Sequence, residues 1–285
     1  MLTPENIILI PIYNDWNSLN ILLKRINNIK KNNIRLIIVN DCSTKKILLK
    51  NKNKITIINL KKNIGSQGCI AVGLKFIEKK KSNLNSNIII MDGDGEDSPK
   101  IINKLINLSH TNSHKIITVN RTKRNENILF KILYEIHILI ISILALKYLR
   151  FGNFSLLKCK NLKKIFSNND ILLSYSAAIS NNFNNIKAIY AKKERRYLDK
   201  SKMNYLKLFL HSLRILSVFK KRIILISLIY TLILFYIFFK KNIKIYMFFI
   251  LVLLLLNLTL NIIYYYFEKS KPKNLLHLIK NFKNY

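Results

Sequence analysis

The chain has 285 residues, in which 49 lysines and arginines stand against 14 aspartates and glutamates, so its formal net charge is +35. Half of the residues are hydrophobic, which excludes a disordered polybasic tail because disorder requires low hydrophobicity. The three cysteines are far apart and odd in number, which excludes a small disulfide scaffold and is typical of a reducing compartment. The positive charge predicts an anionic partner, either a nucleic acid or an anionic membrane surface.

Short apolar runs alternate with helically spaced segments over the first 110 residues. We expect strands at Ile7–Ile12, Leu36–Val39, Ile55–Leu60 and Ile88–Met91, and helices at Trp16–Ile29, Ser66–Lys79 and Pro99–Leu108. This alternation predicts an α/β domain with a mostly parallel sheet flanked by helices. Ligands of such sheets bind beyond the carboxyl ends of the strands.

Two uncharged apolar segments near the C-terminus, Ile223–Phe239 and Ile245–Phe267, would form helices of about 26 and 34 Å. These lengths suit a hydrocarbon core of about 30 Å, so we predict a transmembrane hairpin with both flanks on one side. Tyr205–Val218 has an apolar face and predicts a helix that lies on the membrane. Ile128–Leu149 is apolar but interrupted by charges, and we expect it to pack against the membrane; a third span is the alternative.

These segments predict four regions and a location. The regions are a cytoplasmic α/β domain, an amphipathic interfacial helix, the transmembrane hairpin and a basic cytoplasmic tail, at 1–200, 201–221, 222–267 and 268–285. Residues Met1–Asp15 contain no basic stretch ahead of a long apolar run, so we expect no signal peptide. We therefore predict a multi-pass protein of the inner membrane, with its first domain on the cytoplasmic face.

Acidic side chains follow three of the four predicted strands. Asp15 follows the first strand, Asp41 the second, and four acids lie within six residues after the fourth: Asp92, Asp94, Glu96 and Asp97. Like charges this close repel unless a cation or hydrogen bonds compensate. Hard carboxylate oxygens suit Mg2+ or Mn2+ shared with substrate phosphates. An acidic turn that caps the following helix is the alternative to a metal site.

Six short segments carry a recognisable pattern, in order, over about 200 residues: IPIYND from Ile10, VNDCST from Val39, Asn63–Gly73, MDGDGEDSP from Met91, GNFSL from Gly152 and RYLDKSKM from Arg196. Together with the two-span tail, they resemble the family 2 inverting glycosyltransferases of GT-A fold. The resemblance is strongest to the branch of dolichyl-phosphate mannose synthases and bactoprenol glucosyltransferases. It implies transfer of a hexose from UDP- or GDP-hexose to a polyprenyl phosphate of the undecaprenyl type.

The resemblance also implies roles for individual residues. Asp92, Asp94 and Arg196 are implied to be catalytic, with Mg2+ or Mn2+ held by Asp94 and Glu96. The nucleotide sugar would be bound by Pro11, Tyr13, Asp15, Asp41 and Asp92. The acceptor phosphate would be bound by Arg196 and Lys202, which match the family motif, and by Arg121 and Lys131, which are placed only by approximate spacing.

Several departures from the family pattern leave alternatives open. Asn40 and Cys42 change the second motif, and Asp199 replaces a glycine near the expected phosphate site, so a re-specialised or non-catalytic paralogue is one alternative. Another is a family 2 enzyme of envelope polysaccharide synthesis that acts on a saccharide or other lipid, with Asp97 or Asp199 as base. A nucleic-acid-binding protein would need neither a hairpin nor an acidic loop, so we predict no nucleic-acid partner. The sequence leaves the oligomeric state open, a homo-oligomer included.

Overall fold

A computed structural model describes residues 4–29, 34–49, 54–111, 116–122, 128–198, 205–241, 245–270, 272 and 274–285. The chain divides into two compact units. The first contains Met1–Asn125, Arg150–Lys202 and Pro272–Tyr285, and the second contains Glu126–Leu149 and Met203–Lys271.

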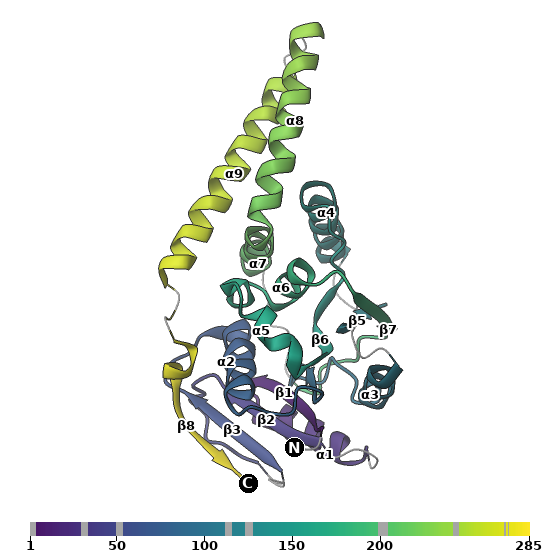
Figure 1. Cartoon of the computed structure of the whole chain (residues 1–285), viewed down its shortest axis with the longest axis vertical. Coiled ribbons are helices and arrows are strands. Elements are labelled where there is room, and N and C mark those ends of the chain that lie inside the picture. The colour runs from purple at the N-terminus through teal and green to yellow at the C-terminus, as the bar shows by residue number, and fades with distance from the viewer. Residues whose placement is uncertain are drawn as a thin grey trace. The chain divides into compact units, whose positions relative to one another are not determined.

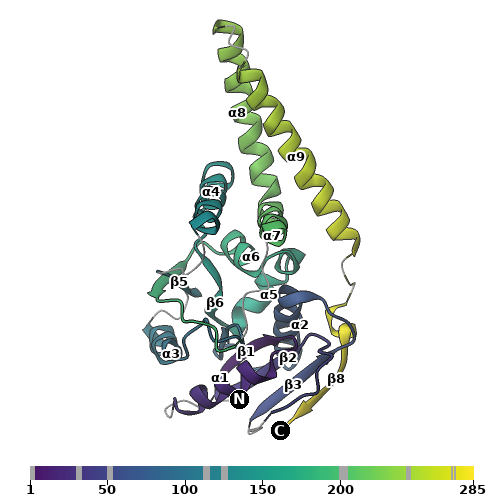
Figure 2. The ribbon, with the colours of Figure 1, turned by 180° about the vertical axis from the view of Figure 1, so that it is seen from behind.

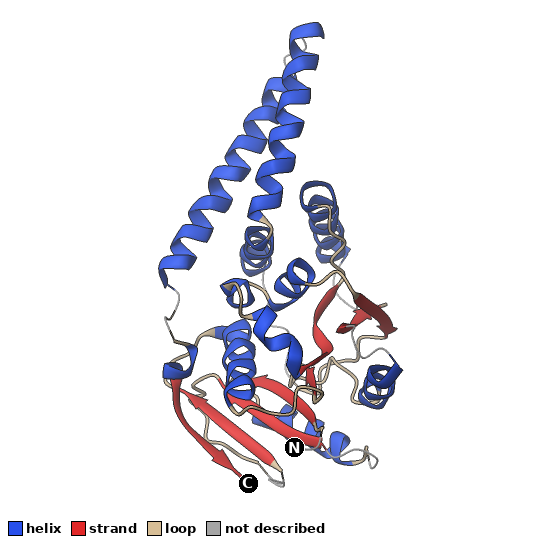
Figure 3. Cartoon of the chain, in the orientation of Figure 1, coloured by secondary structure: helices blue, strands red, loops and turns tan. Residues whose placement is uncertain are grey.

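The first unit is built on one sheet of eight strands in the order β7-β5-β6-β4-β1-β2-β3-β8. Its parallel centre joins β1 to β2 and β4, and β2 to β3, while β6 and β8 run antiparallel to their neighbours (Figure 3). The strands are β1 Asn6–Ile12, β2 Ile34–Asn40, β3 Ile55–Leu60, β4 Asn87–Ile90, β5 Ile116–Arg121, β6 Phe151–Lys158, β7 Ile186–Ala191 and β8 Ile279–Asn284. The prediction of a mostly parallel sheet flanked by helices is confirmed.

Helices cover both faces of this sheet. One buried cluster packs α2, α5 and α6 against one face, and a second packs α1 and α3 against the other (Figures 1 and 2). Gly73 lets α2 approach the sheet closely, since a Cβ there would collide with the side chain of Leu9. The helices are α1 Trp16–Asn27, α2 Gly65–Lys79, α3 Ile101–Thr111, α5 Leu162–Ile165 and α6 Tyr175–Asn182, with 3-10 turns η1 Cys159–Asn161, η2 Asn169–Leu172 and η3 Leu275–Leu278.

The last residues of the chain do not form the basic tail that the sequence predicts for 268–285. Instead η3 and β8 extend the sheet beside β3. Leu275 is buried in the core, and the Phe282 ring packs edge-on against Phe76 with centroids 5.2 Å apart. The sequence IKNFKN hides this strand because only one face of an edge strand meets the core, so its lysines remain in solvent.

The second unit contains the helices α4 Ile128–Ala145, α7 Tyr205–Val218, α8 Lys220–Lys241 and α9 Ile245–Ser270. Of the described helices, α8 and α9 are long and apolar enough to cross a membrane, and little of either is buried. They pack as a pair, and the Asn257 amide donates to Ser227 Oγ over 2.7 Å.

Strand pairing limits how this second unit can cross a membrane. The segment that contains α4 leaves β5 and returns to β6, and these two strands pair with each other. A single crossing by α4 would place paired strands on opposite sides of the bilayer, so the alternative of a third span is wrong. In the same way, α8 and α9 lie between β7 and β8 of one sheet, so they can cross only as a pair.

Candidate active site

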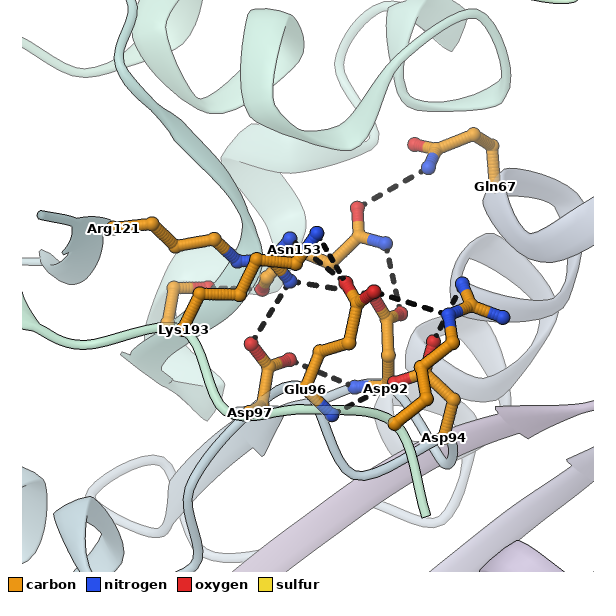
Figure 4. A network of polar contacts seen from close by, with 10 residues as sticks. Gln67, Asp92, Asp94, Glu96, Asp97, Arg121, Asn153 and Lys193 are labelled. Atoms are coloured by element: carbon orange, nitrogen blue, oxygen red, sulfur yellow. Dashed lines mark hydrogen bonds and ion pairs between the residues drawn. The ribbon is translucent and has the colours of Figure 1, made fainter. Parts of the chain in front are cut away.

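The acidic loop follows β4 and precedes α3, where the carboxyl ends of the parallel strands meet. Two of its acids shape the loop itself. The Asp97 side chain is almost fully buried and accepts a hydrogen bond from the Asp92 backbone N–H over 3.0 Å. Asp94 accepts from the Glu96 backbone N–H, also over 3.0 Å. These bonds hold the four carboxylates in one compact turn (Figure 4).

Three cationic side chains surround this turn. Arg121, at the end of β5, lies 3.0 Å from Asp97 and 3.2 Å from Glu96, and its NH2 is 3.9 Å from Asp92. The other contacts are made by two residues that follow β7, with Arg196 2.9 Å from Asp94 and 3.0 Å from Glu96, and Lys193 3.0 Å from Glu96. Among the residues that the structure describes, three positive charges therefore lie beside four carboxylates.

The predicted acceptor-phosphate residues have different positions in the structure. Arg121 and Arg196 contact the acids, because partly buried carboxylates are stable only beside compensating charge. Lys131 lies on α4, in the second unit. Lys202 lies outside the described residues, as does Asp199. Phosphate binding by the two arginines stays a prediction, and their contacts with the carboxylates were not predicted.

The segment 192–198 is fastened to the acidic loop through its backbone as well. The N–H of Glu194 donates to Glu96 O and that of Tyr197 to Asp94 O, each over 3.0 Å. Gly95 has φ +92°, and a Cβ there would lie 2.6 Å from the Tyr197 ring, so only glycine fits beneath this ring. The glycine of the acidic loop thus lets the chain after β7 pack directly on it.

Two amide side chains that the sequence analysis did not select orient Asp92. The Asn153 amide, on β6, donates to Asp92 Oδ1 over 3.1 Å, and the Gln67 amide donates to Asn153 Oδ1 over 3.1 Å (Figure 4). Gln67 Oε1 in turn accepts from the backbone N–H of Tyr175. Asn153 lies inside the GNFSL segment and could have been found there, whereas nothing in the sequence marks Gln67.

Burial and mutual repulsion change the ionisation of these acids. Burial, followed by the charge of Asp97, raises the pKa of Asp92 to about 6. Burial, followed by the charge of Asp92, raises the pKa of Asp94 to about 6 as well. Burial also acts on Glu96, but Lys193, Arg196 and Arg121 outweigh it and lower the pKa of Glu96 below its ordinary value. Nearby cations therefore offset burial only in part at Asp92 and Asp94, whereas they outweigh it at Glu96.

The pKa shifts and contacts of these acids indicate which of them could hold a divalent cation. Asp92 and Asp94 fit, because each offers hard oxygen ligands whose charged form a dication would stabilise. Glu96 fits less well, because Arg121, Lys193 and Arg196 together contact both of its oxygens, whereas Asp94 contacts one cation, Arg196, through one oxygen. Within the described residues, no three His, Cys, Asp or Glu side chains are grouped to hold a metal. A Mg2+-like ion would therefore have two carboxylates and would share substrate phosphates.

We expect Asp94→Asn to stabilise the metal-free protein at neutral pH. The folded pKa of Asp94, about 6, lies above the ordinary value of 3.8, so the folded state binds the proton more tightly. Proton binding by Asp94 therefore stabilises the wild-type fold at low pH, and this stabilisation is lost as pH rises from about 4 to 6. Asparagine does not ionise, so the variant does not lose stability in this way. Urea unfolding in EDTA should show a stability advantage of the variant that grows over this range and then levels off. An advantage independent of pH would contradict the raised pKa.

Of the residues predicted to bind the donor nucleotide besides Asp92, Pro11 lies near the end of β1, Tyr13 and Asp15 in the loop after it, and Asp41 directly after β2. Tyr13 is 42% exposed and Pro11 is buried. Asp15 caps α1 by accepting from the Ser18 N–H over 3.3 Å. Asp41 is 3% exposed, and its two oxygens accept from the backbone N–H groups of the residues that open α2, Ile64 and Gly65, over 2.7 and 2.9 Å. The sheet edge therefore brings these residues to one side, where both aspartates hold helix starts in place.

Asn14, which the sequence analysis did not select, links the loop after β1 to the loop after β2 through hydrogen bonds. Asn14 has φ +57°, and its backbone N–H donates to Ser43 Oγ over 2.9 Å. Its side chain also bonds to Thr44 and to the N–H of Lys45.

A mostly parallel sheet whose β4 leads into a charge-compensated Asp-x-Asp turn is the architecture of the GT-A class of glycosyltransferases. The family model for glycosyl transferase family 2 matches residues 7–171, which is more than half of the chain. The chain belongs to glycosyl transferase family 2.

Solved structures share this fold at low sequence identity. Glucosyl-3-phosphoglycerate synthase from Mycobacterium tuberculosis, in complex with Mn2+, UDP-glucose and phosphoglyceric acid, is similar at 10% identity with a TM-score of 0.56, over 77% of this chain and 80% of that one. TarS from S. aureus in complex with UDP-GlcNAc has 16% identity and a TM-score of 0.49, over 76% and 66%. A second structure of TarS contains TarS residues 1–349, and this chain spans 60% of its length. No curated protein sequence matches this chain.

Proposed function

We propose that this chain is a membrane-bound inverting transferase that moves a hexose from UDP- or GDP-hexose to a polyprenyl phosphate. One observation carries the proposal: a family 2 domain with its acidic turn is joined in one chain to an apolar helix pair. The strands on either side of that pair belong to one sheet, which suits a hairpin with the catalytic domain on a single face of the membrane. We propose the cytoplasmic face of the inner membrane.

The surfaces of α4 and α7 support membrane contact by the second unit. The helix α7 exposes Leu206, Phe209 and Leu210, and α4 exposes a longer series of apolar side chains. The side chains exposed on α4 are Ile128, Leu129, Ile132, Leu133, Ile136, Leu139 and Ile143. Exposed apolar faces of this size on helices of a basic protein favour an anionic bilayer as partner.

Donor binding would use the loops beyond β1, β2 and β4. We propose that Tyr13, Pro11 and the loops held by Asp15 and Asp41 line the nucleotide pocket. The UDP-glucose in the complex of the similarly folded glucosyl-3-phosphoglycerate synthase supports a nucleotide-sugar donor. A Mg2+ or Mn2+ ion held by Asp92 and Asp94, when bound, would neutralise charge that develops on the leaving diphosphate.

The chain's own residues would do the remaining work. The Asn153 amide fixes the carboxylate of Asp92, which is proposed to orient the sugar. Arg121 and Arg196 hold fixed positive charge beside this turn, where it favours both the leaving diphosphate and the incoming phosphate. A polyprenyl phosphate is already anionic at pH 7, so its oxygen can attack the anomeric carbon without a strong base. One displacement inverts the configuration at that carbon.

The structure weakens the rival in which an acid of the loop acts as base toward a saccharide hydroxyl. Asp97 is almost fully buried, with one oxygen on Arg121 and the other on the Asp92 N–H. A general base must reach the proton that it removes, and this carboxylate is enclosed.

The proposal is tested by turnover in membrane extracts. UDP- and GDP-hexoses are supplied with undecaprenyl phosphate, with and without Mg2+ or Mn2+, and the lipid product is separated by thin-layer chromatography. We expect a glycosylated lipid phosphate with at least one donor and a requirement for the metal. Transfer to a saccharide but not to the lipid would overturn the acceptor, and hydrolysis or transfer by no donor would favour the non-catalytic paralogue.

A further inference from the structure

Three asparagines lie side by side on neighbouring strands at the edge of the sheet that ends in β8. Asn40 on β2 is in register with Asn59 on β3, and Asn59 is in register with Asn281 on β8. The Asn40 amide donates to Asn59 Oδ1 over 2.8 Å, and the Asn59 amide donates to Asn281 Oδ1 over 2.7 Å. These bonds form a side-chain ladder across three strands, and its last member comes from the chain after the membrane hairpin.

The ladder continues into the loops proposed to bind the donor nucleotide. Asn40 Oδ1 accepts from the Ser43 backbone N–H over 3.0 Å, and Ser43 Oγ accepts from the Asn14 N–H over 2.9 Å. A continuous series of four hydrogen bonds therefore runs from Asn281 on β8 to the turn after β1. Asn40 and Asn59 each donate through the amide nitrogen and accept through the oxygen, and Asn281 accepts at the end of the series.

The direction of the ladder depends on the amide at its buried end. Asn40 is 6% exposed and uses both its oxygen and its nitrogen within the protein. A carboxylate at this position could accept from Ser43 but could not donate to Asn59, so the amides of Asn59 and Asn281 would both have to turn over to keep the ladder. The asparagine that departs from the family pattern at position 40 thus belongs to a set with Asn59 and Asn281.

We propose that Asn281 is a positioning residue of the donor site, which acts through Asn59 and Asn40 on the loop 41–45. The strand after the hairpin would then complete the nucleotide pocket that precedes the hairpin in the chain. This proposal rests on the proposed function of the same sheet edge as the donor site. It gives β8 a role in substrate affinity beyond closing the edge of the sheet.

The test compares two alanine variants of one strand in the full-length protein. Asn281→Ala removes the last rung of the ladder, and we expect the KM for the nucleotide sugar to rise about 3- to 10-fold with kcat unchanged. Asn284→Ala removes a similar bond, in which Thr56 Oγ1 donates to Asn284 Oδ1 over 2.8 Å, but that bond lies outside the ladder. We expect Asn284→Ala to leave KM unchanged. Asn281→Asp keeps the acceptor oxygen and should restore most of the affinity.

Binding and exchange measurements separate this proposal from the proposed function. Calorimetry with UDP and with GDP should show the same loss of affinity in Asn281→Ala as the KM. Hydrogen exchange of the Ser43 amide should be faster in Asn281→Ala than in Asn284→Ala, whether or not any nucleotide binds. Equal exchange in both variants, or equal rises in KM, would overturn the ladder. A wild type that binds no nucleotide, with faster Ser43 exchange in Asn281→Ala, would overturn only the donor site.

Discussion

Replacing Asp94 with alanine is expected to lower turnover at least about 100-fold while leaving the protein folded and membrane-inserted. Asp94 contacts Arg196, but burial and the charge of Asp92 still raise its pKa to about 6, and in the proposed reaction it holds the dication against the donor's diphosphate. Its loss should also abolish the stabilisation that Mn2+ confers in a thermal unfolding scan. Turnover is measured with the donor and lipid that give the highest wild-type rate.

Two further variants make the interpretation of Asp94→Ala clear. Lys269→Ala, near the C-terminal end of α9, should change turnover little, since it lies far along the chain from the acidic loop. Asp94→Asn should be as inactive as the alanine variant although we expect it to be more stable at neutral pH, which separates lost chemistry from lost folding. Wild-type turnover in Asp94→Ala would remove this residue from the metal site.

Replacing Arg121 with methionine is expected to destabilise the fold by about 2 to 3 kcal/mol. Methionine keeps much of the side-chain volume of arginine but has no charge. Asp97, which is 2% exposed, would lose its contact with Arg121, and Glu96 would lose one of its cationic contacts. The cost comes from an uncompensated buried carboxylate more than from the lost attraction itself. Urea unfolding of the detergent-solubilised protein at pH 7 measures the effect.

The matched control for this variant is Arg35→Met. Arg35 pairs with Glu5 at 3.9 Å, and about a third of each side chain is exposed, so its loss should cost less than about 1 kcal/mol. Arg121→Lys should fall between wild type and Arg121→Met, because a lysine cannot contact Asp97 and Glu96 with two separate nitrogens. Equal stability of the two methionine variants would show that Arg121 does not stabilise the acidic turn.

The N-terminal half of the fold could be predicted because its signals are local. The strand Ile55–Leu60 has the predicted bounds, and α2 starts one residue before the predicted helix. Repeated isoleucines mark buried strands, and helical spacing marks the covering helices. The strands β5 to β8 were missed. The strands β7 and β8 form the two edges of the sheet and are largely exposed, which dilutes their apolar pattern. The strands β5 and β6 are mostly buried, but polar residues interrupt their apolar runs.

The candidate site was only partly predictable, since its partners come from distant segments. The acidic residues after β4 stand together in the chain and predicted a charged site directly. The cations that surround them come from the end of β5 and from the segment after β7, and Gln67 reaches Asn153 from α2. Among 49 lysines and arginines, composition alone cannot select the three that lie beside four carboxylates.

The sequence by itself determined the alternation of strands and helices, the acidic turn after β4 and the two apolar helices, because each depends on residues close together in the chain. Tertiary structure decided the charge state of the turn, since burial and the approach of Arg121, Lys193 and Arg196 set the ionisation of each acid. It also decided that the chain after the hairpin forms β8 beside β3. Electrostatics and strand pairing act through space, so only the folded chain fixes them.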